Sequence, residues 1–544
     1  MHRPVMRTRL LVAAGTIAAL VGLTTQIASA APTSAPRSAP TSPHAAAPQS
    51  TPRAAAQAST TTAAQAAQPA PPTARNSASP IKHVVEVMLE NHSFDNLFGN
   101  FPGADGIPAG TKLQNPKATY DSAPDVSPVW ASPNEGDVYA GIDNSRAAVQ
   151  MSMDYAPHQG YLMDHYTMVP NNGMASITEF GPQFTPNQQY LAGNYALEDR
   201  NFQPAIAPTQ PNVMYALNAD AHGWMYNNLN PDDTRPWNSI FDELADHGRT
   251  GKVYYGVPRS HLTGTIWEKI VPPDLADLST ADQFFTDVSA GSLPDFSFLR
   301  PGVDYSGEPE EDLGNPDAWI GQIVDAVAKS PYWDSTAVFV TYDEGGGFWD
   351  HVSPRVVHPY GYGERTPTMI VSPYVRRGVF HQETTNMSIL SFMQNQWGLP
   401  PLNSLNAQQN NLSDAFDFHQ TPLPAPQMPV APADTLAFRG GQDTSHAPIP
   451  KQNTPATFYL EANGSGLTLD ASANGPVSLT IVPPKGVAVP ANFPATVDLT
   501  AGWASFTTTF TRPGFYRIKA EGPDGSVGWQ TVDVGVNAST LPTP

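Results

Sequence analysis

Two stretches decide the fold: residues 81–99, IKHVVEVMLENHSFDNLFG, and residues 338–354, VFVTYDEGGGFWDHVSP. Each begins with a short apolar run rich in β-branched residues, which is typical of a strand buried on both faces of a sheet. Each run is followed at once by a pair of polar side chains: Glu90 with Asn91, and Asp343 with Glu344. The sequence therefore predicts two buried strands that end in oxygen-bearing groups.

Helical patterns lie around these strands. Asn315-Pro316 is typical of a helix start, and Ser330-Pro331 closes the predicted helix. A later helix, with apolar residues from Ile389 to Trp397, ends at Gly398. A third strand-like run covers residues 368–372. Because strands alternate with helices, the pattern predicts an α/β domain with a mostly parallel central sheet flanked by helices.

The first 80 residues carry no such pattern. Residues 1–30 combine basic residues, a short apolar run and the small-residue site Ala28-Ser29-Ala30, as a secretory signal peptide does. The alternative, a membrane anchor, needs about 20 apolar residues. Residues 31–80 are rich in Ala, Pro, Ser and Thr and cannot offset the entropy of folding. We expect a secreted protein with a disordered linker and no transmembrane segment in the mature chain.

The remaining boundaries follow from composition. The α/β domain is expected over residues 81–420, followed by a polar, proline-rich linker over residues 421–455. Residues 456–544 contain six short strand-like runs separated by Gly, Pro and Asn, which predict a small β-sandwich. That segment has no cluster of acid, base or ligand residues. We interpret it as a packing or attachment module, for example one that contacts a cell wall.

Composition also narrows the chemistry. Beyond residue 80, 49 acidic residues stand against 22 basic ones, a net charge of −27 that disfavours nucleic acid as a partner. The chain has no cysteine, which excludes disulfides, thiolate nucleophiles and zinc sites built on cysteine. A bound metal ion would need oxygen or imidazole ligands, so a hard divalent cation such as Ca²⁺ is the first expectation.

The two polar pairs are the first candidates for such ligands. Open α/β sheets bind ligands beyond the carboxyl ends of their strands, so the pairs converge if the two strands are parallel neighbours. Acidic groups so close together would raise one another's pKa values unless a cation lay among them. A divalent metal site is therefore one interpretation of Glu90, Asn91, Asp343 and Glu344, and ordinary cap or turn chemistry is the other.

Other catalytic signals are fewer. The sequence contains no HExxH zinc helix, no phosphate-binding P-loop and no GxSxG nucleophile elbow. Three histidines remain as candidates, because their pKa lies near neutrality: His158, His222 and His351. Each one alone is more often a surface or structural residue, so its role depends on whether it meets the acidic groups.

Taken together, the two motifs resemble the bacterial phosphoesterase family of phospholipases C and acid phosphatases. The likeness extends over residues 81–400 and includes FPGADGIP after the first motif and GYGERTPTMIVSP after the second. That family is similar in fold to alkaline phosphatases and uses a metal-activated hydroxyl nucleophile. The resemblance thus implies metal contacts from the residues of both polar pairs: Glu90, Asn91, Asp343 and Glu344.

The resemblance also implies a nucleophile. Residues 207–212, Ala-Pro-Thr-Gln-Pro-Asn, resemble the family's Gly-Pro-Thr-Asp-Pro-Asn stretch. This places the nucleophilic hydroxyl on Thr209 and a phosphate-binding amide on Asn212. His351 or His222 would protonate the leaving oxygen, and His158 would contact the substrate.

Two family elements are absent. Where relatives carry Asp-His-Pro, residues 306–317 read SGEPEEDLGNPD, and where they carry Asp-His-Thr, this chain has Thr385-Asn386-Met387. We expect a secreted, metal-assisted hydrolase that acts on a phosphate ester or a phospholipid. The absent histidines favour an alternative: a catalytically degenerate protein that binds phosphate or cell-wall polymer, or that acts in adhesion.

Overall fold

The structure is a computed structural model, and the residues that it describes are 79–113, 127–131, 144–153, 174–227, 237–256, 277–309, 311–432, 434–439, 449–464 and 468–535. The chain divides into two units, Met1–Ala67 and Gln68–Pro544, and all of these residues belong to the second. The expected signal peptide and nearly all of the expected linker after it lie outside the described residues.

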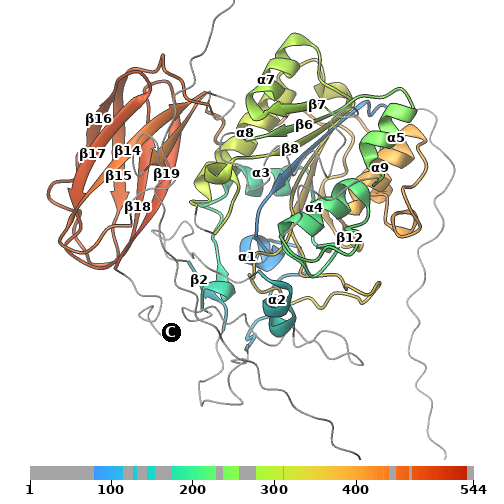
Figure 1. Cartoon of the computed structure of the whole chain (residues 1–544), viewed down its shortest axis with the longest axis horizontal. Coiled ribbons are helices and arrows are strands. Elements are labelled where there is room, and N and C mark those ends of the chain that lie inside the picture. The colour runs from blue at the N-terminus through green and yellow to red at the C-terminus, as the bar shows by residue number, and fades with distance from the viewer. Residues whose placement is uncertain are drawn as a thin grey trace, which may run out of the picture. The chain divides into compact units, whose positions relative to one another are not determined.

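The described residues form an eight-stranded central sheet, in the order β11-β4-β10-β9-β1-β8-β6-β7 (Figure 1). The strand bounds are β1 His83–Leu89, β4 Ala196–Glu198, β6 Gly251–Tyr255, β7 Asp277–Thr280, β8 Phe296–Arg300, β9 Thr336–Tyr342, β10 Thr368–Val371 and β11 Gly378–Phe380. Strands β9, β1, β8, β6 and β7 are parallel, whereas β10 is antiparallel to β9 and β4. This confirms the mostly parallel sheet, and the run expected at 368–372 is its antiparallel strand.

The two strands expected from the sequence motifs are neighbours at the centre of this sheet. Every residue of β9 is buried, as is β1 from Val84 onward. A parallel strand that is covered on both faces needs apolar side chains in both directions, which explains the unbroken apolar runs. The register pairs Leu89 with Tyr342, the last residues of the two strands. Both segments therefore leave the sheet side by side at the same edge.

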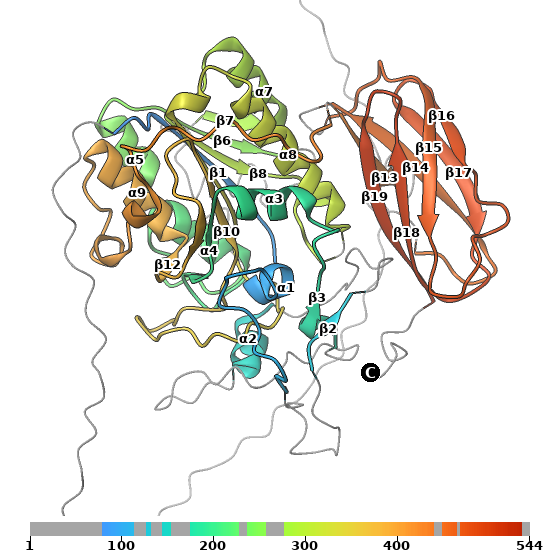
Figure 2. The same cartoon turned by 180° about the vertical axis from the view of Figure 1, so that it is seen from behind.

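Helices cover both faces of the sheet, with α3, α7 and α8 on one face and α4, α5 and α9 on the other (Figures 1 and 2). Their bounds are α3 Pro186–Asn194, α4 Thr209–Asn218, α5 Ile240–Asp246, α7 Ala281–Ala290, α8 Gly314–Ala328 and α9 Met387–Trp397. The two expected helices are α8 and α9, and α9 ends as predicted at Gly398, which has a φ of 69°. Among the described residues, no helix has the length and hydropathy required to span a bilayer.

Short elements complete the α/β domain near the ends of the central strands. They are α1 Phe94–Phe98, α2 Arg146–Ser152, β2 Val129–Trp130, β3 Thr178–Glu179, β5 Asn201–Phe202 and β12 Thr384–Thr385. Helix α1 directly follows β1 and is capped by Ser93, whose Oγ accepts from Asn96 N and donates to Trp349 O at 2.8 Å. This hydrogen bond connects the first sequence motif to the second.

The C-terminal segment forms a second, seven-stranded sheet in the order β16-β15-β18-β19-β13-β14-β17. Its strands are β13 Thr435–Arg439, β14 Pro455–Asn463, β15 Gly475–Val482, β16 Thr496–Leu499, β17 Trp503–Thr509, β18 Gly514–Glu521 and β19 Val527–Val534. The edge strands β16 and β17 are joined by a three-residue turn, so the sheet curls nearly into a barrel. The expected separate C-terminal β-structure is thus confirmed, but its strands form one rolled sheet where two packed sheets of a β-sandwich were expected.

The boundary before this sheet differs from the expectation. Strand β13 lies within the stretch 421–455, which was expected to be a linker, and it pairs with β14 and β19. Leu423 and Met428, from the start of the same stretch, pack against the core of the α/β domain. We therefore propose that the C-terminal domain begins at about Thr435.

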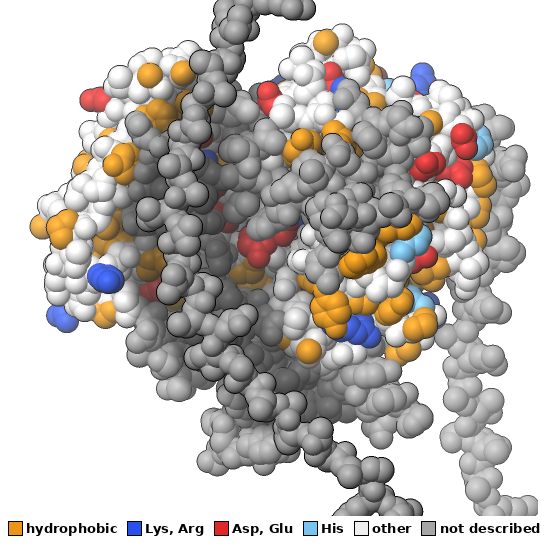
Figure 3. All heavy atoms as spheres, in the orientation of Figure 1, with side chains coloured by type: hydrophobic (Ala, Val, Ile, Leu, Met, Phe, Trp, Pro, Cys, Tyr) orange, Lys and Arg blue, Asp and Glu red, His pale blue; other side chains and the backbone are white. Residues whose placement is uncertain are grey.

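On the visible surface, a group of acidic side chains lies near the middle of the view in Figure 3.

Candidate active site

The two polar pairs meet at the carboxyl ends of β1 and β9. Asp343 N donates to Leu89 O at 3.1 Å, and Asp343 Oδ1 accepts from Asn91 N at 3.3 Å and from Glu344 N at 2.8 Å. All four side chains are buried, with Glu90 the most exposed at 3%. The convergence expected from two parallel neighbouring strands is therefore present.

The glycines after Glu344 permit this close approach. Gly346 has a φ of 67°, and a Cβ atom there would lie 2.1 Å from Asn91 O. A side chain at this position is therefore excluded. Glu344 Oε2 accepts from Gly346 N at 2.8 Å, and its Oε1 accepts from Asn144 Nδ2 at 2.6 Å. The glycine turn thus orients the Glu344 carboxylate.

A buried arginine, which the sequence analysis missed, lies among these acids. Arg300 is the last residue of β8, the other parallel neighbour of β1. Its guanidinium donates to Glu90 Oε1 and lies 3.5 Å from Asp343 Oδ2. The rule of polar residues at strand ends could have found it, because the short run FSFLR precedes a proline.

Glu308 is a second residue that the sequence analysis missed. It follows β8 in the stretch where the family's histidine element is absent, and its Oε2 accepts from Asn91 Nδ2 at 2.6 Å. Together with the three acids of the polar pairs it forms what we call the carboxylate cluster: Glu90, Glu308, Asp343 and Glu344. Burial, together with the neighbouring acids, raises the pKa of Glu308 to about 11.

Asp343 and Glu344 have raised pKa values as well. Burial raises the pKa of Asp343 to about 7, and the Glu90 charge adds to the rise while Arg300 opposes it. Burial and the Asp343 charge raise the pKa of Glu344 well above its usual range. Three buried carboxyl groups and the partly buried Glu308 thus lie near one guanidinium, which contacts Glu90 and Asp343, and this arrangement costs free energy unless a further cation is bound.

One polar atom in the cluster shows that the residues fit a metal ion. Asn91 is 1% exposed, and its Oδ1 has no hydrogen-bond partner among the described residues. A buried amide oxygen without a donor costs about 1–3 kcal/mol, whereas carboxylate and amide oxygens are preferred ligands of hard divalent cations. The donor set of Asn91 and the four acids is therefore chemically suited to such an ion.

Thr209 is the first residue of α4 and is 4% exposed. The link from its loop to the carboxylate cluster runs through Gln203, whose Oε1 accepts from Gly345 N at 2.8 Å. Asn212 binds the same loop: its Oδ1 accepts from Ala205 N, and its Nδ2 donates to Ala207 O. In this structure Asn212 shapes the loop that carries Thr209.

The candidate histidines fall into different places. His158 lies outside the described residues. His222 is exposed, stacks on Trp237 with ring centroids 5.0 Å apart and lies 3.6 Å from the Asp220 carboxylate. Its loop returns to the start of α4, because Asn227 Oδ1 accepts from Gln210 N at 2.8 Å.

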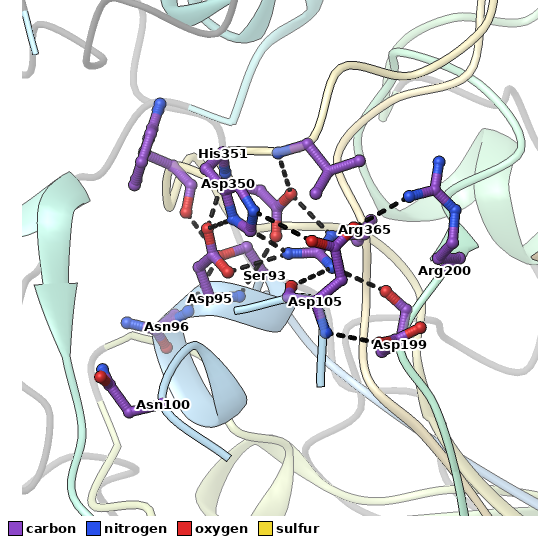
Figure 4. Close-up of polar contacts among 12 residues, drawn as sticks. Ser93, Asp95, Asn96, Asn100, Asp105, Asp199, Arg200, Asp350, His351 and Arg365 are labelled. Carbon is purple, nitrogen blue, oxygen red and sulfur yellow. Dashed lines mark hydrogen bonds and ion pairs between the residues drawn. The ribbon is translucent and has the colours of Figure 1, made fainter. Parts of the chain in front are cut away.

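His351 lies in a separate group of charges, which we call the Arg365 network: Asp95, Asp350, His351 and Arg365 (Figure 4). His351 Nδ1 contacts Asp95 Oδ2 at 2.7 Å, and Arg365 binds Asp95 at 2.9 Å and Asp350 at 2.8 Å. Burial lowers the pKa of His351, but the hydrogen bond and charge of Asp95 outweigh it and raise that pKa overall. The structure places this predicted proton donor beside Asp95.

The Arg365 network also has metal-ligand spacing. Among the described residues, Asp95, Asp350 and His351 form the one group whose ligand atoms lie within 4.8 Å of one another. Their oxygens are already bonded, however: Asp350 accepts from Arg365, Val352 N and Asp95 N, and Asp95 accepts from Arg365 and from His351. We interpret this group as a complete ion-pair network. In the carboxylate cluster, Arg300 contacts both Glu90 and Asp343.

The chain resembles one protein family and several known proteins. The model of the Phosphoesterase family matches residues 81–400. Non-specific phospholipase C1 of Arabidopsis thaliana is 27% identical over 345 residues, which cover 56% of this chain and 63% of that protein. Phospholipase C B of Mycobacterium tuberculosis is 24% identical over 412 residues, which cover 63% and 79%.

A solved structure is similar at a lower level: a protein in the alkaline phosphatase superfamily from Vibrio parahaemolyticus, with a TM-score of 0.32 and 12% identity, covers 53% of this chain and 73% of its own. The chain spans less than two thirds of the length of the Arabidopsis relative. The family model nevertheless matches more than half of the chain and contains both polar pairs, Thr209 and the Arg365 network. The chain therefore belongs to the Phosphoesterase family.

Proposed function

We propose that this protein is a secreted hydrolase of phosphate esters that uses Thr209 as its nucleophile and a divalent cation held by the two polar pairs. The observation that carries the proposal is the meeting of Glu90, Asn91, Asp343 and Glu344 beyond two neighbouring parallel strands. Family membership and the names of the relatives support phosphate ester chemistry.

The proposed reaction has two steps. Thr209 Oγ1 attacks phosphorus, the bond to the leaving oxygen breaks, and a phosphothreonine forms. Water then releases the phosphate group and restores the threonine hydroxyl. The cation, with Ca²⁺ as first candidate, supplies a Lewis acid that favours the threonine alkoxide and offsets charge on the phosphoryl oxygens.

The protein's own residues orient these groups. Asn212 holds the loop before Thr209, and we propose that it acts mainly on the position of the nucleophile. His222 is proposed to give a proton to the leaving oxygen, because its loop returns to the N-terminus of α4. His351 is the alternative donor, although Asp95 and Arg365 surround it. Substrate contact by His158 stays a proposal from the resemblance.

A second candidate function is supported by Arg300. Its guanidinium already binds Glu90 and lies near Asp343, so the protein has an internal cation where the family pattern implies a metal ion. A catalytically degenerate protein that binds phosphate or a cell-wall polymer would need no metal ion in addition to Arg300. Attachment through residues 31–80 or through the C-terminal sheet belongs to the same proposal.

The test compares two substrates and two threonines. We expect the purified protein to release nitrophenol from nitrophenyl phosphate or nitrophenyl phosphorylcholine, and we expect a chelator and Thr209→Ala each to abolish turnover. Thr185→Ala is the matched control, since Thr185 is also buried and lies at the start of a helix, at the N-cap of α3, while Thr209 is the first residue of α4. The preferred ester separates phosphatase from phospholipase. Equal turnover by wild type and Thr209→Ala would refute the nucleophile.

A further inference from the structure

We propose that Glu308 is an additional oxygen ligand of the cation, a role outside the ligand set that the sequence motifs imply. The inference rests on the metal site of the proposed function and concerns what this chain adds to it. Glu308 comes from a different segment than the two polar pairs, yet its carboxylate reaches the Asn91 amide at 2.6 Å. As a ligand, Glu308 must lie close to the other proposed ligands.

The loop that carries Glu308 is firmly held against the end of β1. Ser306 O accepts from Glu90 N at 2.8 Å, and Gly307 O contacts His92 Nε2 at 2.7 Å. Gly307 has a φ of 88°, and a Cβ atom there would lie 3.0 Å from Glu90 O. Because a larger residue is excluded, the backbone brings Glu308 directly beside Glu90 and Asn91.

The hydrogen bond from Asn91 to Glu308 also fixes the other end of the amide. With Nδ2 engaged by Glu308, the Asn91 Oδ1 atom is left buried and without a hydrogen-bond partner among the described residues. An amide held in this orientation presents its oxygen, and not its NH₂ group, to a third group. A cation satisfies that oxygen and attracts the Glu308 carboxylate at the same time.

Charge supports the same conclusion. The carboxylate cluster carries four potential negative charges, and Arg300 provides one positive charge in contact with Glu90 and Asp343. Glu308 accepts from the side chain of Asn91, whereas Asp343 Oδ1 accepts from the Asn91 backbone N. Affinity of oxygen sites for Ca²⁺ rises with the number of charged ligands, so Glu308 should strengthen binding.

The experiment measures cation binding and not turnover. Ca²⁺ affinity is determined by calorimetry, and the number of water molecules on bound Tb³⁺ by its luminescence lifetime in H₂O and D₂O. Glu308→Gln keeps an oxygen that can accept from Asn91 Nδ2 but removes the charge. Glu198→Gln is the control, because it makes the same change at a buried glutamate, 2% exposed, that lies on β4.

We expect Glu308→Gln to weaken Ca²⁺ binding about tenfold or more and to add about one water to bound Tb³⁺, with Glu198→Gln unchanged. Unchanged affinity and hydration in Glu308→Gln, while Asp343→Asn abolishes binding, would overturn the role of Glu308 and leave the proposed metal site standing. No Ca²⁺ or Tb³⁺ binding by the wild-type protein would overturn both. Circular dichroism confirms that each variant is folded.

Discussion

The carboxylate cluster and the Arg365 network both include residues that follow β1 and β9, and each places buried acids around one arginine. They differ in how completely hydrogen bonds and ion pairs satisfy the polar atoms of each group. In the Arg365 network each carboxylate oxygen of Asp95 and Asp350 accepts a hydrogen bond. Beside the four acids of the carboxylate cluster, Arg300 contacts Glu90 and Asp343, and Asn91 Oδ1 has no donor among the described residues.

This difference shows why spacing alone is a poor guide to a metal site. The tighter group, Asp95 with Asp350 and His351, has the right distances but already contains its cation, Arg365. Burial raises acid pKa values in both groups, but the looser group lies beside the unsatisfied oxygen, Asn91 Oδ1. Accounting for every buried polar atom therefore separates an ion-pair network from a site that needs a ligand.

The largest expected effect comes from breaking the Arg365 network. Arg365→Met leaves two buried carboxylates without their guanidinium, and it also removes donors to the backbone oxygens of Asp105 and Asp199. Removing one partner of a buried ion pair costs about 3–5 kcal/mol of unfolding free energy. Chemical denaturation should show this loss equally with chelator and with Ca²⁺.

The control for that variant is Arg355→Met, since Arg355 pairs with Glu383 at a site where its side chain is 62% exposed. An exposed pair contributes little, so its unfolding free energy should change by less than about 1 kcal/mol. If Ca²⁺ restored the unfolding free energy of Arg365→Met, the Arg365 network would also bind the ion. That result would contradict the proposed difference between the two groups.

The second prediction applies the same change to the carboxylate cluster. Arg300→Met removes the positive charge near Glu90 and Asp343, so with chelator we expect a loss of about 3 kcal/mol. Here Ca²⁺ should restore stability, since ligand at 100 times its Kd contributes about 2.7 kcal/mol. Denaturation curves with chelator and with Ca²⁺ measure both the loss and the recovery of unfolding free energy.

The gain on adding Ca²⁺ should be larger for Arg300→Met than for the wild-type protein, because the guanidinium no longer competes for the two carboxylates. An equal gain in both proteins would mean that Arg300 and the ion do not share ligands. No gain in either would favour the degenerate binding protein, in which Arg300 is the permanent cation of the site.

The central sheet and the meeting of the polar pairs could be predicted because both follow from local patterns. The apolar runs of β1 and β9 are continuous, and polar residues at the ends of parallel neighbours must converge. Strand β13 was missed because its five residues lie in a proline-rich stretch, and its pairing with β14 and β19 is decided by tertiary contacts.

The end of a strand-like run is a sequence signal for Arg300, but the roles of Arg300 and Glu308 depend on which strand neighbours β1, and local sequence does not determine that pairing. The run that ends at Arg300 is only five residues long, and its pairing with β1 joins residues more than 200 positions apart. The stretch 306–317 lacks the family's histidine, and the resemblance assigns no role to its other residues. The structure shows what it contains instead, a carboxylate bonded to Asn91.

The smallest expected effect is a pH dependence that belongs to the Arg365 network. Burial lowers the pKa of His351, but Asp95 raises it further, so the net shift is upward. A histidine whose pKa is raised by folding stabilises the protein fully below its unfolded value of about 6.5, and this contribution is lost as pH rises through the folded pKa. His351→Gln keeps a donor to Asp95 but cannot titrate, so the wild-type protein should lose on the order of 1 kcal/mol relative to this variant on going from about pH 6 to about pH 8. Denaturation across that range in the presence of chelator provides the test. A constant difference would mean that folding leaves the pKa of His351 unshifted, and a gain by the wild-type protein would mean that His351 is neutral in the folded state; either result would contradict the prediction.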